Sequence, residues 1–232
     1  MYNRIMLKLS GEALSGEKGV VDQSIVNAIC AEIKRCVDMG VQVTIVVGGG
    51  NIWRGRSGSK DMDRGKSDNI GMLATVINSL ILQASLEELG VASRVQTAVE
   101  MKEIAEPYIS NKAKKQLEDG NVILFAAGLG IPYVSTDTAA VLRAIEMSVD
   151  AIFCAKNIDG VYNSDPKTNG IATKYDSITP TEILASGLSV MDATAVALCR
   201  EYHVPIHLFG LDDVKNISRV LMGENIGTYI SE

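Results

Sequence analysis

The sequence of 232 residues is short of aromatic side chains, of positive charge and of long apolar runs. Aromatic residues make up 5% of it, so the core must come from the aliphatic residues that dominate its 47% hydrophobic content, enough for one large domain or two small ones. A nucleic-acid binder usually has a basic face, whereas this chain has a net charge of -6. No apolar run approaches the roughly 20 residues of a membrane-spanning helix. We therefore expect neither nucleic acid nor membrane as a partner.

Paired cysteines are also missing. The four cysteines show no CxxC spacing and lie among apolar residues, which is typical of buried free thiols in a reducing compartment: Cys30, Cys36, Cys154 and Cys199. The chain enters an apolar segment at Arg4, which leaves no room for a signal peptide. Both observations predict a cytoplasmic protein.

Common metal and nucleophile motifs are absent as well. We find no Ser-His-Asp elbow and no signature of a nucleophilic cysteine. His203 and His207 have the four-residue spacing of a zinc-binding pair, but Pro205 between them breaks any helix. We interpret both histidines as structural and predict no metal site built from side chains.

The two commonest phosphate-binding motifs are incomplete. The run Gly65–Ser67 resembles the end of a P-loop, yet Lys60 stands where the first glycine is required. The run Gly128–Gly130 could open a dinucleotide fingerprint, but Tyr133 occupies the place of the third glycine. A phosphate would have to be bound by another route.

The segment Val43–Asn51 offers such a route. Its strand-favouring residues lead directly into Gly48, Gly49 and Gly50. A near-continuous β-branched run is typical of a strand buried on both faces of a parallel sheet. Glycines at its carboxyl end leave backbone N–H groups open to an anion, and ligands of open α/β sheets lie just past the strand ends. We expect a phosphate here; the alternative is a tight turn that needs positive φ.

A second strand end of this kind comes earlier in the chain. Residues 4–9 form a short apolar strand that runs into Lys8–Ala13. A lysine beside a Ser-Gly turn can offer a compact positive charge to phosphate oxygens. Alone the signal is weak, because lysines at strand ends usually face solvent.

The hydrophobic pattern alternates strands and helices as far as Cys154, which predicts a mostly parallel sheet with helices on both faces. The chain is then rich in turns as far as Ser177. Expected strands are 4–9, 43–47, 91–95, 122–126, 151–154, 205–209 and 226–230. Expected helices are 22–37, 68–88, 102–119 interrupted at Pro107, 136–147, 181–186, 192–202 and 213–222. Residues 51–66 should form a polar loop before helix 68–88. This helix has one apolar face, which consists of Ile70, Leu73, Ile77, Leu80, Ile81 and Ala84.

Several runs together resemble the amino acid kinase family. The family resemblance begins with Lys8–Ala13 and with Gly48–Asn51 followed by Arg54-Gly55. Further runs resemble its bacterial UMP kinase branch: Asp68–Thr75, Ser135–Ala140, Asp159–Tyr162 with Asp165-Pro166, Val190–Asp192, and Gly223-Glu224 with Gly227-Thr228. Each run is modest alone, but their order along the whole chain argues against a chance match.

The resemblance implies a fold and a reaction. The fold is α/β, a three-layer α/β/α sandwich with a mostly parallel central sheet, over residues 1–232 as a single domain. The reaction moves the γ-phosphate of ATP, with Mg²⁺, to UMP and gives UDP and ADP for pyrimidine nucleotide synthesis. The resemblance also implies a cytoplasmic homohexamer. Activation by GTP is not assumed, because Gly16–Asp22 lacks the Gly-Phe-Gly of many relatives.

The resemblance also assigns roles to residues. Phosphoryl transfer needs positioning and charge neutralisation. Lys8 is therefore expected at the transferring phosphoryl group, and Asp137 is expected to orient Lys8 or its neighbours. Arg54 is expected as a forked clamp on phosphate oxygens. ATP is expected at Lys8, Leu9, Ser10, Gly11, Gly50, Arg54, Asn157, Tyr162 and Asp165, with Tyr162 on adenine. UMP is expected at Gly49, Asp68, Leu129, Gly130, Ile131, Pro132, Tyr133, Val134, Ser135 and Thr136.

Some alternatives stay open. Residues 155–159 are one residue fewer than in some relatives, so either Lys156 or Asn157 could reach ATP. Asp137 could be a plain helix N-cap. A related kinase could phosphorylate carbamate, glutamate or aspartate instead. A non-catalytic nucleotide-binding protein could keep the glycines yet lose Lys8 or Asp137, and both residues are present here.

Overall fold

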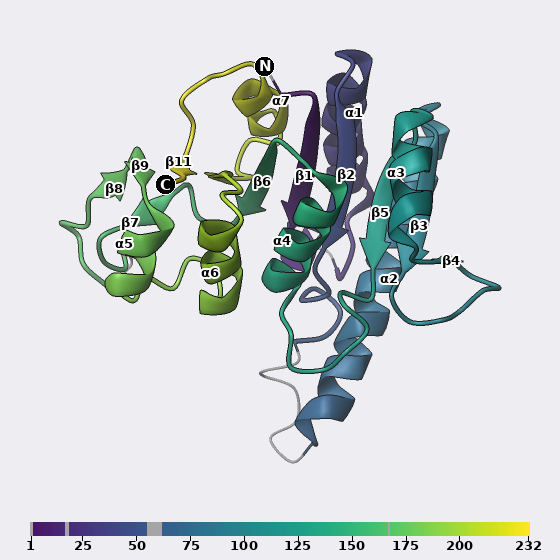
Figure 1. Ribbon diagram of the computed structural model, residues 1–232, viewed down its shortest axis with the longest axis horizontal. Helices are drawn as coiled ribbons and strands as arrows, with labels where there is room; N and C mark the ends of the chain where they lie inside the picture. Colours follow the sequence, from purple (N-terminus) through teal and green to yellow (C-terminus); the bar gives the residue numbers. More distant parts are fainter. Residues whose placement is uncertain (1, 17–18, 55–61, 167) are drawn as a thin grey trace.

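The computed structural model describes residues 2–16, 19–54, 62–166 and 168–232. Within them nine strands form one sheet in the order β4-β3-β5-β2-β1-β6-β10-β11-β9 (Figure 1). Neighbouring strands of this sheet run parallel in the described part, apart from the pair β10 and β11. The strands are β1 (Arg4–Leu9), β2 (Gln42–Val47), β3 (Ser93–Thr97), β4 (Glu106–Pro107), β5 (Val122–Ala126), β6 (Ala151–Lys156), β9 (Ser177–Ile178), β10 (Ile206–Gly210) and β11 (Thr228–Ile230).

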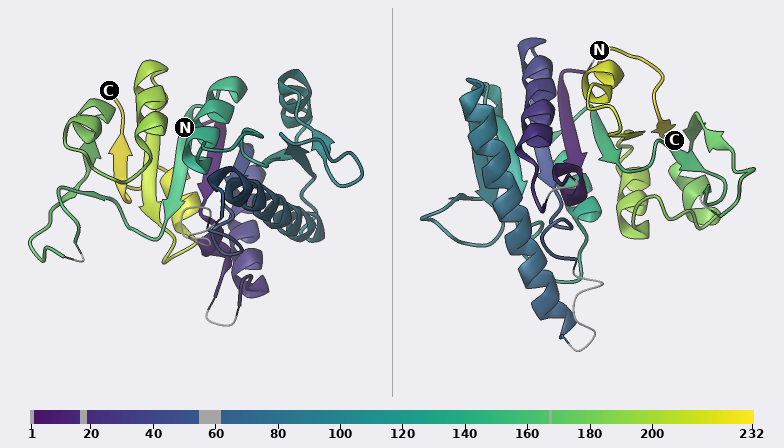
Figure 2. Two further views of the ribbon diagram at one scale, coloured as in Figure 1. Left: turned by 90° about the horizontal axis from the view of Figure 1, so that it is seen from below. Right: turned by 180° about the vertical axis from the view of Figure 1, so that it is seen from behind.

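Helices cover both faces of this sheet, which confirms the predicted three-layer α/β/α fold (Figures 1 and 2). One face packs against α1 (Gln23–Asp38), α2 (Arg64–Glu88) and α7 (Asn216–Leu221). The other packs against α3 (Ser110–Glu118), α4 (Thr136–Met147) and α6 (Ala193–Glu201), with α5 (Pro180–Ala185) beside α6. Each face has its own aliphatic core, as the shortage of aromatic residues requires.

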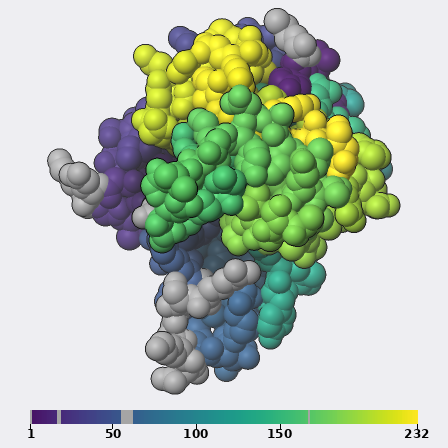
Figure 3. All heavy atoms as spheres, turned by 90° about the vertical axis from the view of Figure 1, so that its left-hand side faces the viewer, coloured from purple at the N-terminus to yellow at the C-terminus, as the bar shows by residue number. Residues whose placement is uncertain are grey.

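The turn-rich segment after β6 lies at the β9 end of the sheet. It forms a two-stranded antiparallel hairpin of β7 (Val161–Tyr162) and β8 (Lys174–Tyr175). The hairpin and α5 face the viewer in Figure 3, coloured green. This segment therefore extends the sheet sideways and leaves the ends of the central strands open.

The carboxyl ends of β1, β2, β5 and β6 meet at one edge of the sheet, because these strands are parallel neighbours. This edge points down in Figure 1, and α2 projects beyond it. The glycine segment after β2 and the Lys8–Ala13 run after β1 both lie there, as predicted. We call it the carboxyl edge.

Two predicted element boundaries are wrong. The long helix starts at Arg64 with Asp63 as its N-cap, so Asp68 lies in its second turn and does not head it. Residues 55–61 of the predicted polar loop lie outside the described residues. The segment before Pro107 is not helical; Pro107 lies in the short edge strand β4, and α3 begins at Ser110. Proline suits an edge strand because its missing N–H is not needed there.

Only part of the predicted apolar face of helix α2 meets the core, through Leu80 and Ile81. Leu73 and Ile77, near the centre of that apolar face, are 54% and 47% exposed, and Ile70 is exposed as well. Small and polar residues are buried instead: Ser67, Ala74, Thr75, Asn78, Ser79 and Ser85, together with Val76, Leu82 and Leu86. By length and composition alone α2 could cross a membrane, which inspection of the sequence missed, but 44% of its most apolar window is buried inside the protein.

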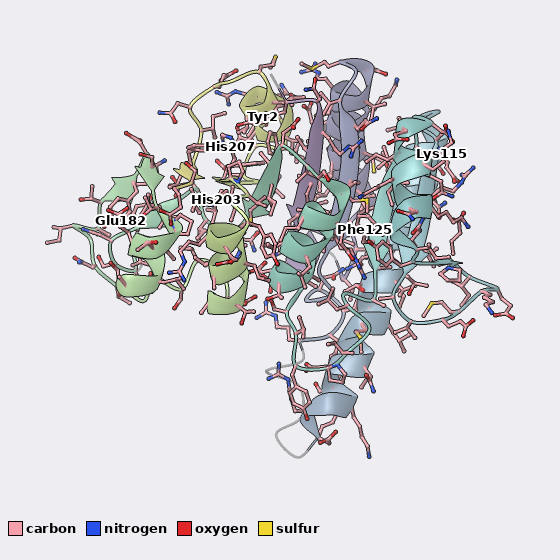
Figure 4. The ribbon with its side chains drawn as sticks, in the orientation of Figure 1. Tyr2, Lys115, Phe125, Glu182, His203 and His207 are labelled. Carbon is pink, nitrogen blue, oxygen red and sulfur yellow. The ribbon has the colours of Figure 1, made fainter. Side chains whose placement is uncertain are left out.

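The cysteines and histidines behave as structural residues. All four cysteines are buried and free. His207 Nε2 and the Tyr2 hydroxyl share a hydrogen bond of 2.5 Å, and the His207 ring meets the rings of Tyr2 and Phe153 edge-on. Burial lowers the pKa of His207 to about 4. Figure 4 shows both histidines above α6, and His207 lies opposite Phe153 in the middle of the sheet.

Candidate active site

Two lysines and one aspartate form a cluster at the centre of the carboxyl edge. Lys8 comes from β1, Lys156 ends the neighbouring strand β6, and Asp137 lies in the first turn of α4. Lys8 Nζ is 2.6 Å from Asp137 Oδ1, and Lys156 Nζ is 3.1 Å from Asp137 Oδ2. Because Lys8 pairs with Cys154, Lys156 projects from the same face of the sheet two residues further on. One carboxylate therefore bridges two cations.

Ion pairing outweighs burial in setting the charges of this cluster. Burial lowers the pKa of Lys8, but the Asp137 carboxylate more than compensates and holds that pKa above its ordinary value. Burial likewise raises the pKa of Asp137, but Lys8 and then Lys156 bring it below its usual range. Lys8 and Asp137 are thus both charged at neutral pH. With the Lys156 ammonium group the cluster has one net positive charge, which suits an anionic phosphoryl group.

The start of α4 is fixed by Ser135. Its hydroxyl oxygen accepts hydrogen bonds from the N–H groups of Asp137 and Thr138, both at 3.1 Å. The hydroxyl groups of Ser135 and Thr138 in turn donate to the carboxylate of Asp192. The alternative in which Asp137 is a plain N-cap is therefore wrong. Ser135 occupies the cap position, which leaves the Asp137 carboxylate to the two lysines.

Lys156 and Asn157, which the sequence left open, point to different neighbours. Lys156 Nζ donates to Asp137 and to the carbonyl oxygen of Val190. Asn157 Nδ2 donates to Glu12 Oε2 at 3.2 Å. The role of Lys156 in the cluster was missed from the sequence. A usable signal existed, because Lys156 ends a buried strand in the same way as Lys8.

The glycine segment after β2 packs tightly on the turn after β1. The Gly48 N–H donates to the Leu9 carbonyl oxygen at 2.9 Å. A Cβ atom at Gly11 would lie 2.6 Å from Gly50 N and 2.7 Å from Gly48 O, so a larger residue does not fit. Gly48, Gly49 and Gly50 have no positive φ, so the tight-turn alternative is wrong. Close approach of the two backbones is what requires glycine here.

A cavity of about 470 Å³ lies between the glycine segment, α2 and the loop after β5; we call it the acceptor cavity. Its volume falls in the usual range for small-molecule sites. Asp68 stands in its wall and accepts hydrogen bonds from the Tyr133 N–H and from Arg64 Nε, both at 2.9 Å. Most residues predicted for UMP line this cavity, namely Gly49, Asp68, Leu129, Ile131, Val134, Ser135 and Thr136. Gly130, Pro132 and Tyr133 do not line it; Gly130 turns the loop with a φ of +76°.

Several lining residues of the acceptor cavity were not predicted. They come mainly from the first turns of α2 and from the end of β5: Arg64, Gly71, Met72, Thr75 and Ala127, together with Trp53. The sequence placed the start of α2 one turn too late and assigned a role to Asp68 alone among the residues of this helix. This is why the rest of the α2 side of the cavity was missed.

A larger cavity of about 740 Å³ lies on the other side of Ser135, between α4, α5 and α6; we call it the outer cavity. Asp137 and Lys156 line it, and so does the segment before α6 that includes Val190 and Met191. The two cavities share Arg64, Val134 and Ser135. Two residues of the cluster thus line the outer cavity, which adjoins the acceptor cavity at Ser135.

The remaining residues predicted for ATP are spread along the carboxyl edge. The Leu9 side chain is fully buried in the core, so a ligand could meet only its backbone. Ser10 Oγ caps the short 3-10 helix η1 (Gly11–Leu14) by accepting from the Ala13 N–H. The Arg54 guanidinium forms an ion pair with Glu12 and lines the acceptor cavity.

Tyr162 and Asp165 belong to the β7–β8 region. The Tyr162 hydroxyl donates to Asp159 Oδ1 at 2.9 Å. Neither residue lines the acceptor cavity or the outer cavity. The structure thus brings Lys8, Asp137 and the acceptor residues together and leaves Tyr162 and Asp165 further along the edge.

A dedicated metal site is not evident in the described part of the chain, which contains no group of three or more His, Cys, Asp or Glu side chains able to hold an ion. The Asp137 carboxylate, which is close to the cluster centre, is already engaged by two lysines. These residues do not fit an ion held by the protein alone.

Comparison with known proteins gives one family and several similar structures. A model of the amino acid kinase family matches residues 3–210. The UMP kinase from Bacillus anthracis is 40% identical, with 99% of this chain and 96% of that one covered and a TM-score of 0.96. The UMP kinase from Ureaplasma parvum is 38% identical, with 100% of both chains covered and a TM-score of 0.94. The uridylate kinase from Archaeoglobus fulgidus is 24% identical, with 98% of this chain and 99% of that one covered. Its TM-score of 0.76 shows the shared fold.

Proposed function

The chain belongs to the amino acid kinase family, and from this premise we propose that it is a UMP kinase, which transfers the γ-phosphate of ATP to UMP and releases UDP and ADP. The observation that carries the proposal is the Lys8–Asp137–Lys156 cluster, which is next to the acceptor cavity because Asp137 directly follows Thr136 in the cavity wall. A related kinase would share the cluster, so the choice of UMP rests on the similarity to the two UMP kinases. Residues 1–232 form one catalytic domain around the single sheet.

The cluster explains how the transfer is accelerated. As the bond to the leaving group loosens, charge builds on the oxygens of the transferring phosphoryl group and must be stabilised in place. The ammonium groups of Lys8 and Lys156 lie within about 3 Å of one carboxylate, which holds them together before substrate arrives. Asp137 therefore acts as the orienting group and the lysines as the charge-stabilising groups. Gly11, Gly49 and Gly50 supply backbone N–H donors to phosphate oxygens.

UMP and ATP lie at different parts of the carboxyl edge. UMP occupies the acceptor cavity, with its phosphate toward Gly49 and its base toward Asp68 and the loop 129–136. ATP lies along the ends of β1 and β6, against residues 8–11, Gly50, Arg54 and Asn157, with Tyr162 and Asp165 as its outer contacts. Arg54 clamps phosphate oxygens from the rim. Mg²⁺ comes with ATP and is held chiefly by phosphate oxygens, because the described side chains offer no cluster of their own.

Assembly and location complete the proposal. The exposed apolar face of α2, which includes Leu73 and Ile77, is a subunit contact in a homohexamer. A neighbouring subunit would bury the exposed apolar residues of α2, so no membrane is required to cover them. Free buried cysteines suit a cytoplasmic enzyme of pyrimidine nucleotide synthesis. Light scattering at micromolar concentration measures the assembly, and a monomer would refute it.

An acceptor panel tests the function. ADP release from ATP is measured with UMP, CMP, dUMP, glutamate and carbamate in parallel. We expect strong activity with UMP and a much lower kcat/KM with CMP, because a site that hydrogen-bonds one base edge leaves buried groups unpaired with another. Equal kcat/KM for UMP and CMP would refute the specificity. Activity with glutamate or carbamate in place of UMP would assign the chain to another acceptor class.

A further inference from the structure

The polar side of α2 contains a fully buried asparagine that faces the glycine segment. Asn78 has no exposed surface. Its Nδ2 donates to the Gly48 carbonyl oxygen and to Asn51 Oδ1, both at 2.7 Å. Its Oδ1 accepts from Asn51 Nδ2 at 3.1 Å. The two side-chain amides therefore form a reciprocal pair, and Asn78 also holds the backbone of the glycine segment.

Burying an amide in the middle of a helix lowers stability unless its hydrogen bonds are satisfied. An aliphatic residue at this position would pack on the sheet as Leu82 and Leu86 do one and two turns later. Asn78 gives up that packing and gains three specific contacts with one loop. The buried amide therefore favours one arrangement of that loop over others.

The loop that Asn78 holds is in contact with the second phosphate segment. Asn51 Oδ1 and the Gly48 carbonyl oxygen both lie within 2.7 Å of the place where a Cβ of Gly11 would be. Asn51 Nδ2 also donates to the Val20 carbonyl oxygen at 2.9 Å. The amide pair therefore fixes the distance between the turn after β1 and the glycine segment after β2.

A neighbouring residue on α2 acts in the same way on the opposite lip of the acceptor cavity. Thr75 Oγ1 accepts a hydrogen bond from the Ala127 N–H at 2.9 Å. Ala127 follows β5 and has a φ of +59°, an uncommon conformation for alanine that a specific partner helps to hold. One face of α2 thus forms hydrogen bonds with the segments after β2 and β5, which both border the acceptor cavity.

We propose that Asn78, paired with Asn51, is a positioning residue that holds the Gly48–Gly50 backbone in the arrangement required for phosphoryl transfer. The proposal rests on the proposed function for its kinetic part. Asn78 is too deeply buried to touch a substrate itself. Its removal should therefore reduce turnover more than it weakens binding, because misplacement of donors by about 1 Å can cost on the order of 100-fold in rate.

The test compares Asn78→Ala with Ser79→Ala. Ser79 is equally buried on α2, but its hydroxyl donates only to the Thr75 carbonyl oxygen of its own helix among the described contacts, so it is a matched control. We expect Asn78→Ala to lower kcat by roughly 10- to 100-fold with a smaller change in the KM for UMP. It should also speed amide hydrogen exchange in residues 46–53. Ser79→Ala should change neither quantity by more than about twofold.

Asn51→Ala keeps the proposal testable if Asn78→Ala does not fold. Asn51 lies on the half-buried loop, so its truncation spares the core. The double variant should lose no more activity than either single variant, because the two amides act as a unit. Unchanged kcat and unchanged exchange in Asn78→Ala, or equal losses in Ser79→Ala, would overturn the proposal. If the wild type does not phosphorylate UMP, the proposed function fails, and the exchange of residues 46–53 still decides whether Asn78 holds the loop.

Discussion

Helices α1 and α2 cover the same face of the sheet but meet it with opposite kinds of surface. α1 buries Val26, Ile29 and Ile33 against the strands and leaves residues such as Ala31 exposed. α2 buries serine, threonine and asparagine at its site end and exposes Leu73 and Ile77. Both helices lie beside parallel strands, so the difference does not come from the type of sheet.

The difference follows from where each helix lies along the strands. α1 packs alongside the strands, mostly through apolar side chains, and its one buried charged residue, Glu32, accepts a hydrogen bond from the Ser218 hydroxyl of α7. α2 extends past the carboxyl edge, where Gly48 and Ala127 present backbone groups that need partners. A helix that packs on the segments after the strands needs polar residues on its inner face to hydrogen-bond their backbone groups. Some of its apolar residues then lie on its outer, exposed face.

Lys8→Ala is the strongest test of this comparison, because it changes the carboxyl edge and leaves the packing of α1 on the strands intact. We expect kcat to fall on the order of 10²–10³, roughly 3–4 kcal/mol in the activation barrier, because one preorganised charge contact is lost. ATP affinity, measured separately by calorimetry, should change much less. If kcat is kept and only the KM for ATP rises, Lys8 binds substrate without stabilising the transition state.

A change within the α1 core should have the opposite signature. Ile29→Val removes one methylene group from a fully buried side chain, and we expect it to lower the free energy of unfolding by roughly 0.5–1.5 kcal/mol. Urea denaturation measures this change. At a temperature well below unfolding, kcat should stay at the wild-type value. A clear loss of kcat would show that α1 also shapes the site.

The smallest effect on subunit stability is expected at the exposed face of α2. Leu73→Glu should change the free energy of subunit unfolding by no more than about 0.5 kcal/mol, as is usual for surface positions. It should nevertheless reduce the assembled mass measured by light scattering, because a charge would be buried at the contact. Ala31→Glu on the exposed side of α1 is the matched control and should keep the wild-type mass. A wild-type mass for Leu73→Glu would place the subunit contact elsewhere.

The sequence predicted the sheet and its helices well where hydrophobic periodicity comes only from burial against the sheet. The strands β1, β2 and β5 and the helix α1 were found because burial alone determines their residues. The same reasoning selected the apolar face of α2, of which Leu80 and Ile81 pack against the core but Leu73 and Ile77 are exposed. Periodicity reports where apolar residues gather, but it does not say whether the sheet or another subunit covers them.

The site was predicted in part for a similar reason. Lys8, Asp137 and the glycines carry recognisable local patterns. Lys156 was named only as an alternative to Asn157 and Asn78 was missed, because their importance depends on which strands and loops lie next to them in space. Asn78 in particular looks like an ordinary helix residue until the Gly48 carbonyl oxygen is seen opposite it.

The central place of β1 in the sheet has a consequence for synthesis on the ribosome. β1 is made first and can pair early with β2, but its other neighbour is β6, where Ile5 lies opposite Ala151. Until residue 156 has emerged, one flank of β1 is an open edge and Lys8 lacks both Asp137 and Lys156 around it. The nascent chain must therefore keep a half-built sheet from pairing with other chains for most of its translation. The Lys8–Asp137–Lys156 cluster is completed only when β6 has been made, because Lys156 ends that strand.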